Sequence, residues 1–235
     1  MKSERKFVKI LSVISESGYE GLQIEYDLLP DSLLREPKRV SSLIGDASLE
    51  TVAVAITANP YNIHFTSEIN GKVGTLCLFE KSFKEATRET QKLLRVCAKL
   101  GVKLAVHPHV RSNVETIQQV EDILASCDDR NLSLVFDSAH FTALGWDLTN
   151  FLERFHENIS VVHIKDLRRL KSPSTINYNR DFVDIGDGII DFDRLINSFK
   201  KIGYDGWLIM EVDHSQQANP AVSVKKNYDR LSSLV

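Results

Sequence analysis

The sequence predicts an α/β barrel of the (β/α)8 type, in which parallel strands alternate with helices. Helix-period and strand-like segments alternate almost to the end of the chain, as expected of repeated βαβ units. The strand-like segments are nearly continuously apolar, which indicates that helices cover both faces of the sheet. A Gly-Tyr-acid-Gly corner also recurs, as GYEG at residues 18–21 and GYDG at residues 203–206. The 235 residues fit one such barrel, so we expect a single domain over residues 1–235.

The N-terminal half opens on a helix where a barrel would be expected to begin with a strand. Four apolar residues at helical spacing predict this amphipathic helix: Phe7, Ile10, Leu11 and Ile14. Strands are expected at residues 22–25, 51–56 and 75–79, and a helical stretch interrupted by Pro37 lies between the first two. Residues 57–74 show no convincing crossover helix.

The C-terminal half continues the alternation with clearer signals. We expect helices at residues 83–100, 114–124, 148–155 and 192–199, the first of them capped by Gly101, and a closing helix over residues 224–231. Strands are expected at residues 102–106, 132–136, 159–164 and 207–212. Seven strands in all leave the barrel incomplete or irregular at its N-terminal edge. Because an unpaired sheet edge invites pairing, we expect the tail or a second copy of the chain, in a homodimer, to cover it.

Composition and charge narrow the class of protein. The net charge of −3 lacks the basic excess that is typical of nucleic-acid binding. No apolar run approaches the roughly 20 residues that a membrane span needs, and the opening MKSERKF is not followed by the apolar stretch of a signal peptide. Cys77, Cys97 and Cys127 are few and widely spaced, which favours reduced thiols. We therefore expect a cytoplasmic protein with no nucleic-acid or membrane partner.

Polar side chains gather where four of the predicted strands end. Strand 102–106 leads into two histidines, strand 132–136 into an aspartate and a histidine, strand 159–164 into a histidine and a lysine, and strand 207–212 into a glutamate. These residues are His107, His109, Asp137, His140, His163, Lys165 and Glu211. Parallel strands lie about 5 Å apart and their carboxyl ends share one rim, where ligands bind. Any one of these residues alone is more often structural, but their convergence from four strands predicts a site.

The mixture of imidazoles and carboxylates predicts one divalent metal ion. Such ligands suit first-row ions better than Ca²⁺, so Mn²⁺, Co²⁺, Zn²⁺, Fe²⁺ and Mg²⁺ are the candidates. Glu211 would then end its strand because it holds the metal. Glu25 ends an earlier strand, where it is expected to cap, to form an ion pair or to contact substrate. Lys165 could instead form a simple ion pair with Asp166.

Several motifs resemble a known family. They are VVHIKDLR, the long block DIGDGIIDFDRLINSFKKIGYDGWLIMEVD and the ANP that follows it. Together they resemble the xylose-isomerase-like TIM-barrel superfamily of sugar isomerases, epimerases and dehydratases. Inosose dehydratases look most similar, because they share the H-x-H, D-x-x-H, H-x-K-D-x-R and GDG-x-I-D-F patterns. The resemblance is strong over residues 102–231 and weak before residue 75.

The resemblance implies a ligand set for the divalent metal. Members of this superfamily bind the ion through a Glu, an Asp, a His and a second Glu from successive strands. By position, Asp137, His163 and Glu211 match the last three. His107 stands where many relatives have Glu, so it departs from the pattern; His107, His109 or Glu115 would supply the remaining ligand. This departure weakens an epimerase interpretation, because such epimerases use that Glu as a catalytic base.

Three functional hypotheses follow. The first is a metal-dependent enzyme acting on a small sugar or cyclitol ketone, in which the metal polarises the carbonyl and a base removes the α-proton. Glu211 is the candidate base, His140 or Lys165 would transfer protons or contact hydroxyls, and His109, Arg168 and Glu25 are candidate substrate contacts. The second is an abasic-site nuclease of the same fold, which the charge disfavours. The third is a non-catalytic, diverged sugar-binding barrel.

Overall fold

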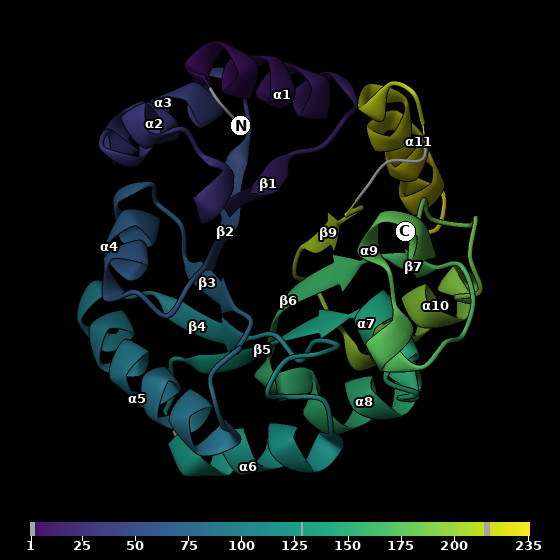
Figure 1. The fold of residues 1–235 in the computed structure, drawn as a ribbon. Helices are drawn as coiled ribbons and strands as arrows, with labels where there is room; N and C mark the ends of the chain where they lie inside the picture. Colours follow the sequence, from purple (N-terminus) through teal and green to yellow (C-terminus); the bar gives the residue numbers. More distant parts are fainter. Residues whose placement is uncertain (1–2, 128, 214–216) are drawn as a thin grey trace.

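The structure is a computed structural model that describes residues 3–127, 129–213 and 217–235. Seven parallel strands form a nearly closed barrel with helices around it (Figure 1). Along the sheet each strand pairs with the next, in the order β1-β2-β3-β4-β5-β6-β9. The strands are β1 (Gly21–Glu25), β2 (Glu50–Ile56), β3 (Val73–Leu76), β4 (Lys103–Val106), β5 (Leu132–Asp137), β6 (Ile159–Ile164) and β9 (Leu208–Met210). The predicted seven-stranded parallel barrel is therefore confirmed.

The helices that surround the barrel follow the expected alternation. They are α1 (Glu4–Glu16), α2 (Asp31–Leu34), α3 (Pro37–Asp46), α4 (Pro60–Glu68), α5 (Phe83–Leu100), α6 (Ile117–Cys127), α7 (Ser138–Ala143), α8 (Leu148–Phe155), α9 (Tyr178–Asp181), α10 (Phe192–Ile202) and α11 (Pro220–Ser232). Short 3-10 turns cover Tyr26–Leu28, His156–Asn158 and Pro173–Thr175. Among the described residues no helix combines the length and apolar character that crossing a bilayer requires.

The expectation that residues 57–74 lack a crossover helix is wrong, because α4 occupies this segment. The Asn59 side chain caps it by accepting from the Tyr61 N–H at 3.0 Å, and Pro60 begins it. The inner face of α4 carries buried polar residues beside its apolar ones. Asn62 is buried and accepts hydrogen bonds from the backbone N–H and hydroxyl of Thr57. These polar residues interrupt the apolar stripe by which a helix is recognised.

The open edge of the barrel lies between β1 and β9, which are not paired within the described residues. Side chains bridge this seam in place of a strand. Gln23 on β1 reaches His163 on β6 at 3.0 Å, and Tyr19 packs edge-on against Tyr228 with ring centroids 5.0 Å apart. The Tyr19 hydroxyl also donates to the Val224 carbonyl at 3.0 Å, which ties the first turn to α11. The tail thus covers part of the edge, and the homodimer stays a prediction.

The helix faces pack against the barrel as the sequence periodicity predicts. On α5, Leu93, Leu94 and Cys97 are buried, and each fully buried leucine contributes about 1.5–3 kcal/mol. Ser82 caps the start of α5, and Gly101 ends it in the left-handed conformation with φ +66°. Glycine has no Cβ to oppose this conformation, so the predicted cap is confirmed.

A small antiparallel pair, β7 (Asp166–Leu167) and β8 (Phe182–Val183), follows β6 and was not anticipated from the sequence. The buried Asp166 carboxylate organises the turn after it. It accepts backbone N–H groups from Leu167, Gly186, Gly188 and Ile190 at 2.8 to 3.2 Å. Asp166 is therefore the anchor of the GDG turn rather than the ion-pair partner of Lys165.

The closing helix α11 docks through a buried carboxylate next to β8. Asp184 accepts from the Asn227 amide at 2.8 Å and from the Ser223 hydroxyl, and Asn227 in turn accepts from the Ile185 backbone N–H at 2.6 Å. Burial alone would raise the pKa of Asp184, but the hydrogen bonds from Ser223 and Asn227 lower it. This carboxylate stays ionised and fixes the tail on the barrel.

Gly188→Ala is expected to destabilise the fold. A Cβ at position 188 would overlap Asp166 Oδ1 and the Leu167 carbonyl oxygen, so the Asp166 turn would have to shift. Overpacking of this kind costs about 1–3 kcal/mol of unfolding free energy. Gly45→Ala within α3 is the matched control, because a Cβ there meets no atom within 4 Å. It should gain about 0.5–1 kcal/mol. Urea denaturation of both variants checks this, and equal stabilities would contradict it.

Candidate metal centre

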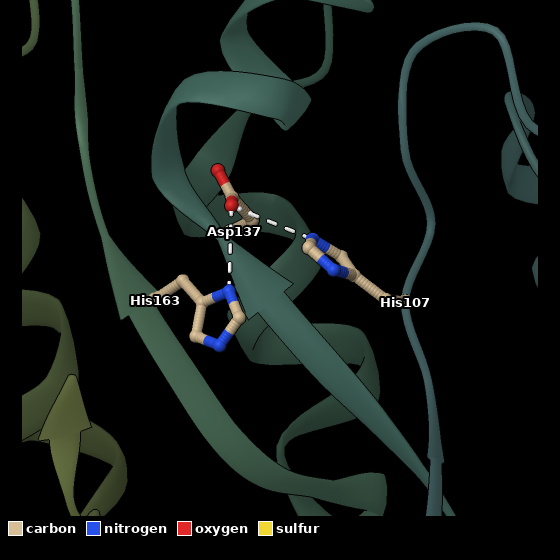
Figure 2. A group of neighbouring side chains, drawn as sticks. All are labelled: His107, Asp137 and His163. Carbon is tan, nitrogen blue, oxygen red and sulfur yellow. Dashed lines mark ion pairs between the residues drawn. The ribbon is translucent and has the colours of Figure 1, made fainter. Parts of the chain in front are cut away.

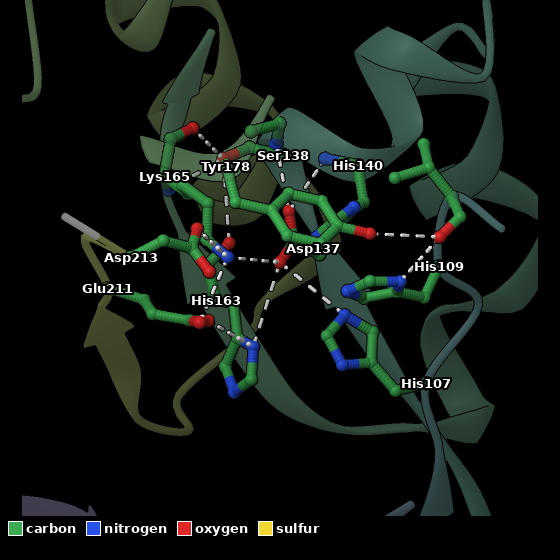
Figure 3. A network of polar contacts seen from close by, with 12 residues as sticks. His107, His109, Asp137, Ser138, His140, His163, Lys165, Tyr178, Glu211 and Asp213 are labelled. Carbon is green, nitrogen blue, oxygen red and sulfur yellow. Dashed lines mark hydrogen bonds and ion pairs between the residues drawn. The ribbon is translucent and has the colours of Figure 1, made fainter. Parts of the chain in front are cut away.

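Three strand ends bring His107, Asp137 and His163 together at one rim of the barrel (Figure 2), and Glu211 joins them from the end of β9 (Figure 3). Asp137 is the last residue of β5 and stands beside His163 of β6 in the parallel register. His107 directly follows β4, and Glu211 directly follows β9. The Glu211 backbone N–H donates to the Ile164 carbonyl at 3.1 Å, which extends the pairing of β9 with β6 by one residue. The sheet itself therefore sets the positions of all four side chains.

The three most deeply buried of these residues form a compact cluster. Asp137 Oδ2 lies 3.4 Å from His107 Nε2 and 3.7 Å from His163 Nδ1. One ligand atom from each of the three lies within 4.8 Å of the other two. Glu211 joins the cluster through Oε2, which lies 3.0 Å from His163 Nδ1.

Each of the four residues presents toward this point one buried atom that has no hydrogen-bond partner outside the cluster. The atoms are His107 Nε2, Asp137 Oδ2, His163 Nδ1 and Glu211 Oε2. Elsewhere the same side chains are anchored: Asp137 Oδ1 accepts the backbone N–H groups of Ala139 and His140 at 2.9 and 2.8 Å. A buried polar group that lacks a hydrogen bond costs about 1–3 kcal/mol, so four that mainly face one another require an explanation. Two imidazoles and two carboxylates with free lone pairs fit a divalent first-row cation.

Lys165 lies under the cluster and is almost fully buried (Figure 3). Its ammonium is 2.9 Å from Glu211 Oε1, 3.0 Å from Asp213 Oδ2 and 3.8 Å from Asp137 Oδ2. Burial by itself lowers the pKa of Lys165, but the Glu211 and Asp137 carboxylates outweigh it and raise this pKa above the usual range. Asp213 was not among the predicted site residues, although its place two residues after Glu211 puts both carboxylates on one side of an extended chain.

The charged neighbours also set the ionisation of the ligands. Burial raises the pKa of Glu211, but Lys165 and His163 outweigh it and hold this pKa well below its usual range. Burial lowers the pKa of His163, yet the Glu211 and Asp137 carboxylates raise it to about 9. Glu211 is therefore an ionised carboxylate at neutral pH, and the two carboxylates favour a positive charge on the His163 imidazole.

The rings of two further histidines, His109 and His140, pack beside His107. The His109 and His140 rings lie 3.7 Å apart between centroids, and His109 Nδ1–H donates to the Val110 carbonyl at 2.7 Å. Burial lowers the pKa of His109 to about 3 and that of His140 well below its usual range, so both are neutral. The Tyr178 hydroxyl from α9 donates to the same carbonyl at 3.3 Å (Figure 3).

The remaining candidates lie outside this cluster. Arg168 is exposed, and its Nε donates to the Arg180 carbonyl at 2.9 Å. Glu115 accepts the Arg111 backbone N–H and so holds the loop after β4. Glu25 is exposed at the end of β1 and accepts from the Gln23 amide at 3.0 Å. Gln23 contacts His163, a role that the sequence analysis did not foresee.

Comparison with known proteins shows the family to which the chain belongs. A family model described as the xylose isomerase-like TIM barrel matches residues 62–234, so the chain belongs to that family. Among curated proteins it is similar to the inosose dehydratase of Mesomycoplasma hyopneumoniae (strain J / ATCC 25934 / NCTC 10110). The two are 26% identical over 266 aligned residues, which cover 97% of this chain and 89% of that protein.

Solved structures show the same fold. The probable 3-DHS dehydratase AsbF of Bacillus anthracis superposes with a TM-score of 0.82 at 15% identity, over 99% of this chain and 94% of that one. The IOLI protein, solved with a zinc atom, superposes with a TM-score of 0.81 at 19% identity, over 100% of this chain and 94% of that one. At these identities the likeness concerns the fold.

Lys165→Met is expected to destabilise the metal-free protein by about 3–5 kcal/mol, because it leaves buried carboxylates without their counter-charge. Lys201→Met is the matched control. Lys201 forms an ion pair with Glu153 at 2.8 Å, but the two side chains are 72% and 51% exposed, and such pairs contribute less than about 1 kcal/mol. Unfolding free energies from urea titration decide the point. Similar losses in both variants would show that the Lys165 cluster is not a buried charge network.

Proposed function

We propose that the chain is a metal-dependent enzyme that acts on a sugar or cyclitol ketone by removing the proton α to the carbonyl. Reprotonation would give an isomer or epimer, and loss of a β-hydroxyl would give a dehydrated product. The observation that carries the proposal is the convergence, at the carboxyl ends of the strands, of four buried side-chain atoms that have no hydrogen-bond partner outside their cluster. The inosose dehydratase relatives and the zinc in the IOLI structure support it.

His107, Asp137, His163 and Glu211 would hold the metal. Among the three candidates for the remaining ligand we favour His107, because its Nε2 is free and lies 3.4 Å from Asp137 Oδ2. His109 uses Nδ1 on the Val110 carbonyl, and Glu115 is engaged by the Arg111 backbone. When bound, the ion would supply Lewis-acid polarisation of the substrate carbonyl and of an adjacent hydroxyl.

Glu211 is the proposed base. Its side chain is 32% exposed, whereas that of Asp137 is fully buried, so Glu211 is the carboxylate that an entering substrate can reach. It is ionised at neutral pH because Lys165 and His163 stabilise its negative charge. The Lys165 ammonium, 2.9 Å from Glu211 Oε1, is placed to donate to a substrate hydroxyl and to stabilise charge there. His140 is the second candidate for proton transfer, since both of its ring nitrogens lack hydrogen-bond partners.

Purified protein loaded with Zn²⁺ or Mn²⁺ is expected to retain about one ion per chain, because the cluster offers one convergent set of ligand atoms. The Asp137→Ala, His163→Ala double variant should retain little, since it removes two of the four ligands. Elemental analysis after exhaustive dialysis measures both. Full metal content in the double variant would place the metal elsewhere.

Metal-loaded Glu211→Gln is expected to lose α-proton exchange. The amide has the size of the carboxylate but cannot accept a proton as a base. 2-Keto-myo-inositol and a panel of ketohexoses are incubated in D₂O, and deuterium entry at the α-carbon is followed by NMR. The wild type should exchange and the variant should not, while its metal content is checked separately.

Glu211→Asp separates the base role from the ligand role. Shortening the side chain moves the carboxylate by about 1 Å, which can lower kcat on the order of 10²-fold if the group abstracts the proton. If Glu211 only holds the metal, saturating metal should restore the rate. Equal exchange in wild type and Glu211→Gln would assign the base to another group, with His140 and Lys165 the next candidates.

A further inference from the structure

We infer that Gln23 and Glu25 form a positioning pair that fixes which ring nitrogen of His163 faces the metal. The inference rests on the proposed metal role of His163 and adds a role for the first strand. Gln23 Oε1 lies 3.0 Å from His163 Nε2, and Gln23 Nε2 donates to Glu25 Oε1 at 3.0 Å. Neither residue is a ligand; both act through His163.

The local structure of β1 aims both side chains at the barrel interior. Gln23 and Glu25 are two residues apart, so they share a face of the strand, while Ile24 between them is buried in the core on the other face. The pairing of β1 with β2 shifts register between Leu22 and Gln23. Irregularities of this kind re-aim side chains near active sites. Gln23 is thereby directed across the seam to a residue 140 positions later in the chain.

The hydrogen-bonding capacities of the three groups fix a single arrangement. The NH₂ end of the Gln23 amide donates to Glu25 Oε1, which uses that end of the amide. The carbonyl end then faces His163, and because a carbonyl only accepts, Nε2 of the imidazole must carry a proton. When a metal replaces the second ring proton, the imidazole keeps the proton on Nε2, so the lone pair that binds the metal is on Nδ1. Nδ1 is the nitrogen that lies 3.0 Å from Glu211 Oε2 and 3.7 Å from Asp137 Oδ2.

Glu25 thus gains a positioning role in addition to the cap, ion pair or substrate contact expected of it. Without Glu25 the Gln23 amide could rotate and present its NH₂ group to Nε2, which would move the ring proton to Nδ1 and block the metal-facing lone pair. Partners of this kind orient metal-binding histidines, and their loss costs about 10- to 100-fold in metal affinity. The open N-terminal edge of the barrel therefore contributes directly to the site through one side-chain hydrogen bond.

The test measures Zn²⁺ affinity by competition with a chromophoric chelator. Gln23→Leu, which removes the acceptor, should bind Zn²⁺ about 10- to 100-fold more weakly than wild type. Gln118→Leu is the matched control, because its amide also donates to a carboxylate, Asp122 at 2.9 Å, but on an exposed face of α6. It should bind as wild type does. Unfolding of the metal-free variants shows whether the fold is intact.

Exchanging the side chains at positions 23 and 25 tests whether their hydrogen bonds, rather than the stability of the fold, set the Zn²⁺ affinity. In the Gln23→Glu, Glu25→Gln double variant, the residue at 23 accepts from both His163 and the amide at 25, so Zn²⁺ affinity should return to near the wild-type value. Single Glu25→Ala should lose less affinity than Gln23→Leu. Long-range ¹H–¹⁵N correlation of the Zn²⁺-loaded wild type should show His163 protonated at Nε2 and metal-bound at Nδ1, whatever the folding of the variants.

The outcomes separate this inference from the proposed function. Unchanged Zn²⁺ affinity in Gln23→Leu, or a His163 bound through Nε2, overturns the positioning pair and leaves the metal site in place. A wild type that binds none of the tested metals overturns both, and that failure appears in the wild type itself rather than in the variants.

Discussion

The fully buried carboxylate of Asp137 joins the fold to the site. Its Oδ1 caps α7 by accepting the backbone N–H groups of Ala139 and His140, and its Oδ2 faces His107, His163 and Lys165. A carboxylate with no contact to water is tolerable only where donors and positive charges surround it. The chain supplies them from β4, β6 and α7, so the strand ends must meet at this point for Asp137 to be buried at all.

The two halves of the barrel contribute to the site unequally. The strand ends from β4 to β9 supply the proposed ligands, the buried Lys165 and the His109 and His140 rings. The N-terminal strands supply Gln23, which crosses the open seam to His163, and Cys77, whose Sγ lies 3.4 Å from His107 Nδ1. Each contact is made to the ring nitrogen of a proposed histidine ligand that is not the one facing Asp137. The open seam therefore has Gln23 on its β1 side and Glu211, which follows β9, on the other, and the proposed ligands converge although β1 and β9 are not paired within the described residues.

The sequence was sufficient for the barrel and for the ligand cluster for the same physical reason. Buried strands are recognisable as apolar runs, and parallel strands end at a common rim, so His107, Asp137, His163 and Glu211 could be expected to meet. The features that escaped prediction lack such a pattern. In helix α4 the buried polar residues Asn62 and Thr66 interrupt the apolar inner face. Strands β7 and β8 are two residues long, which is too short to show a period.

Roles that depend on a single side-chain contact were also beyond the sequence. Asp166 follows Lys165 directly, which suggested an ion pair. Its carboxylate instead accepts hydrogen bonds from the backbone N–H groups of Gly186 and Gly188. Lys165 instead forms ion pairs with Glu211 and Asp213, which lie in the segment after β9, more than forty residues later in the chain. Such partners are set by the curvature of the barrel, which no local pattern records.

The distribution of exposure around the cluster indicates how a substrate would meet it. The side chains of His107, Asp137, His163 and Lys165 are at most 7% exposed, whereas those of Glu211 and Asp213 are 32% and 25% exposed. The accessible side of the site is therefore the β9 side, next to the seam. With the proposed function, a ketone that enters there would meet the carboxylate of Glu211 before the other proposed ligands. That order suits a group that both completes the ligand set and takes a proton from the substrate, because one side of its carboxylate is turned to His163 and the other to Lys165.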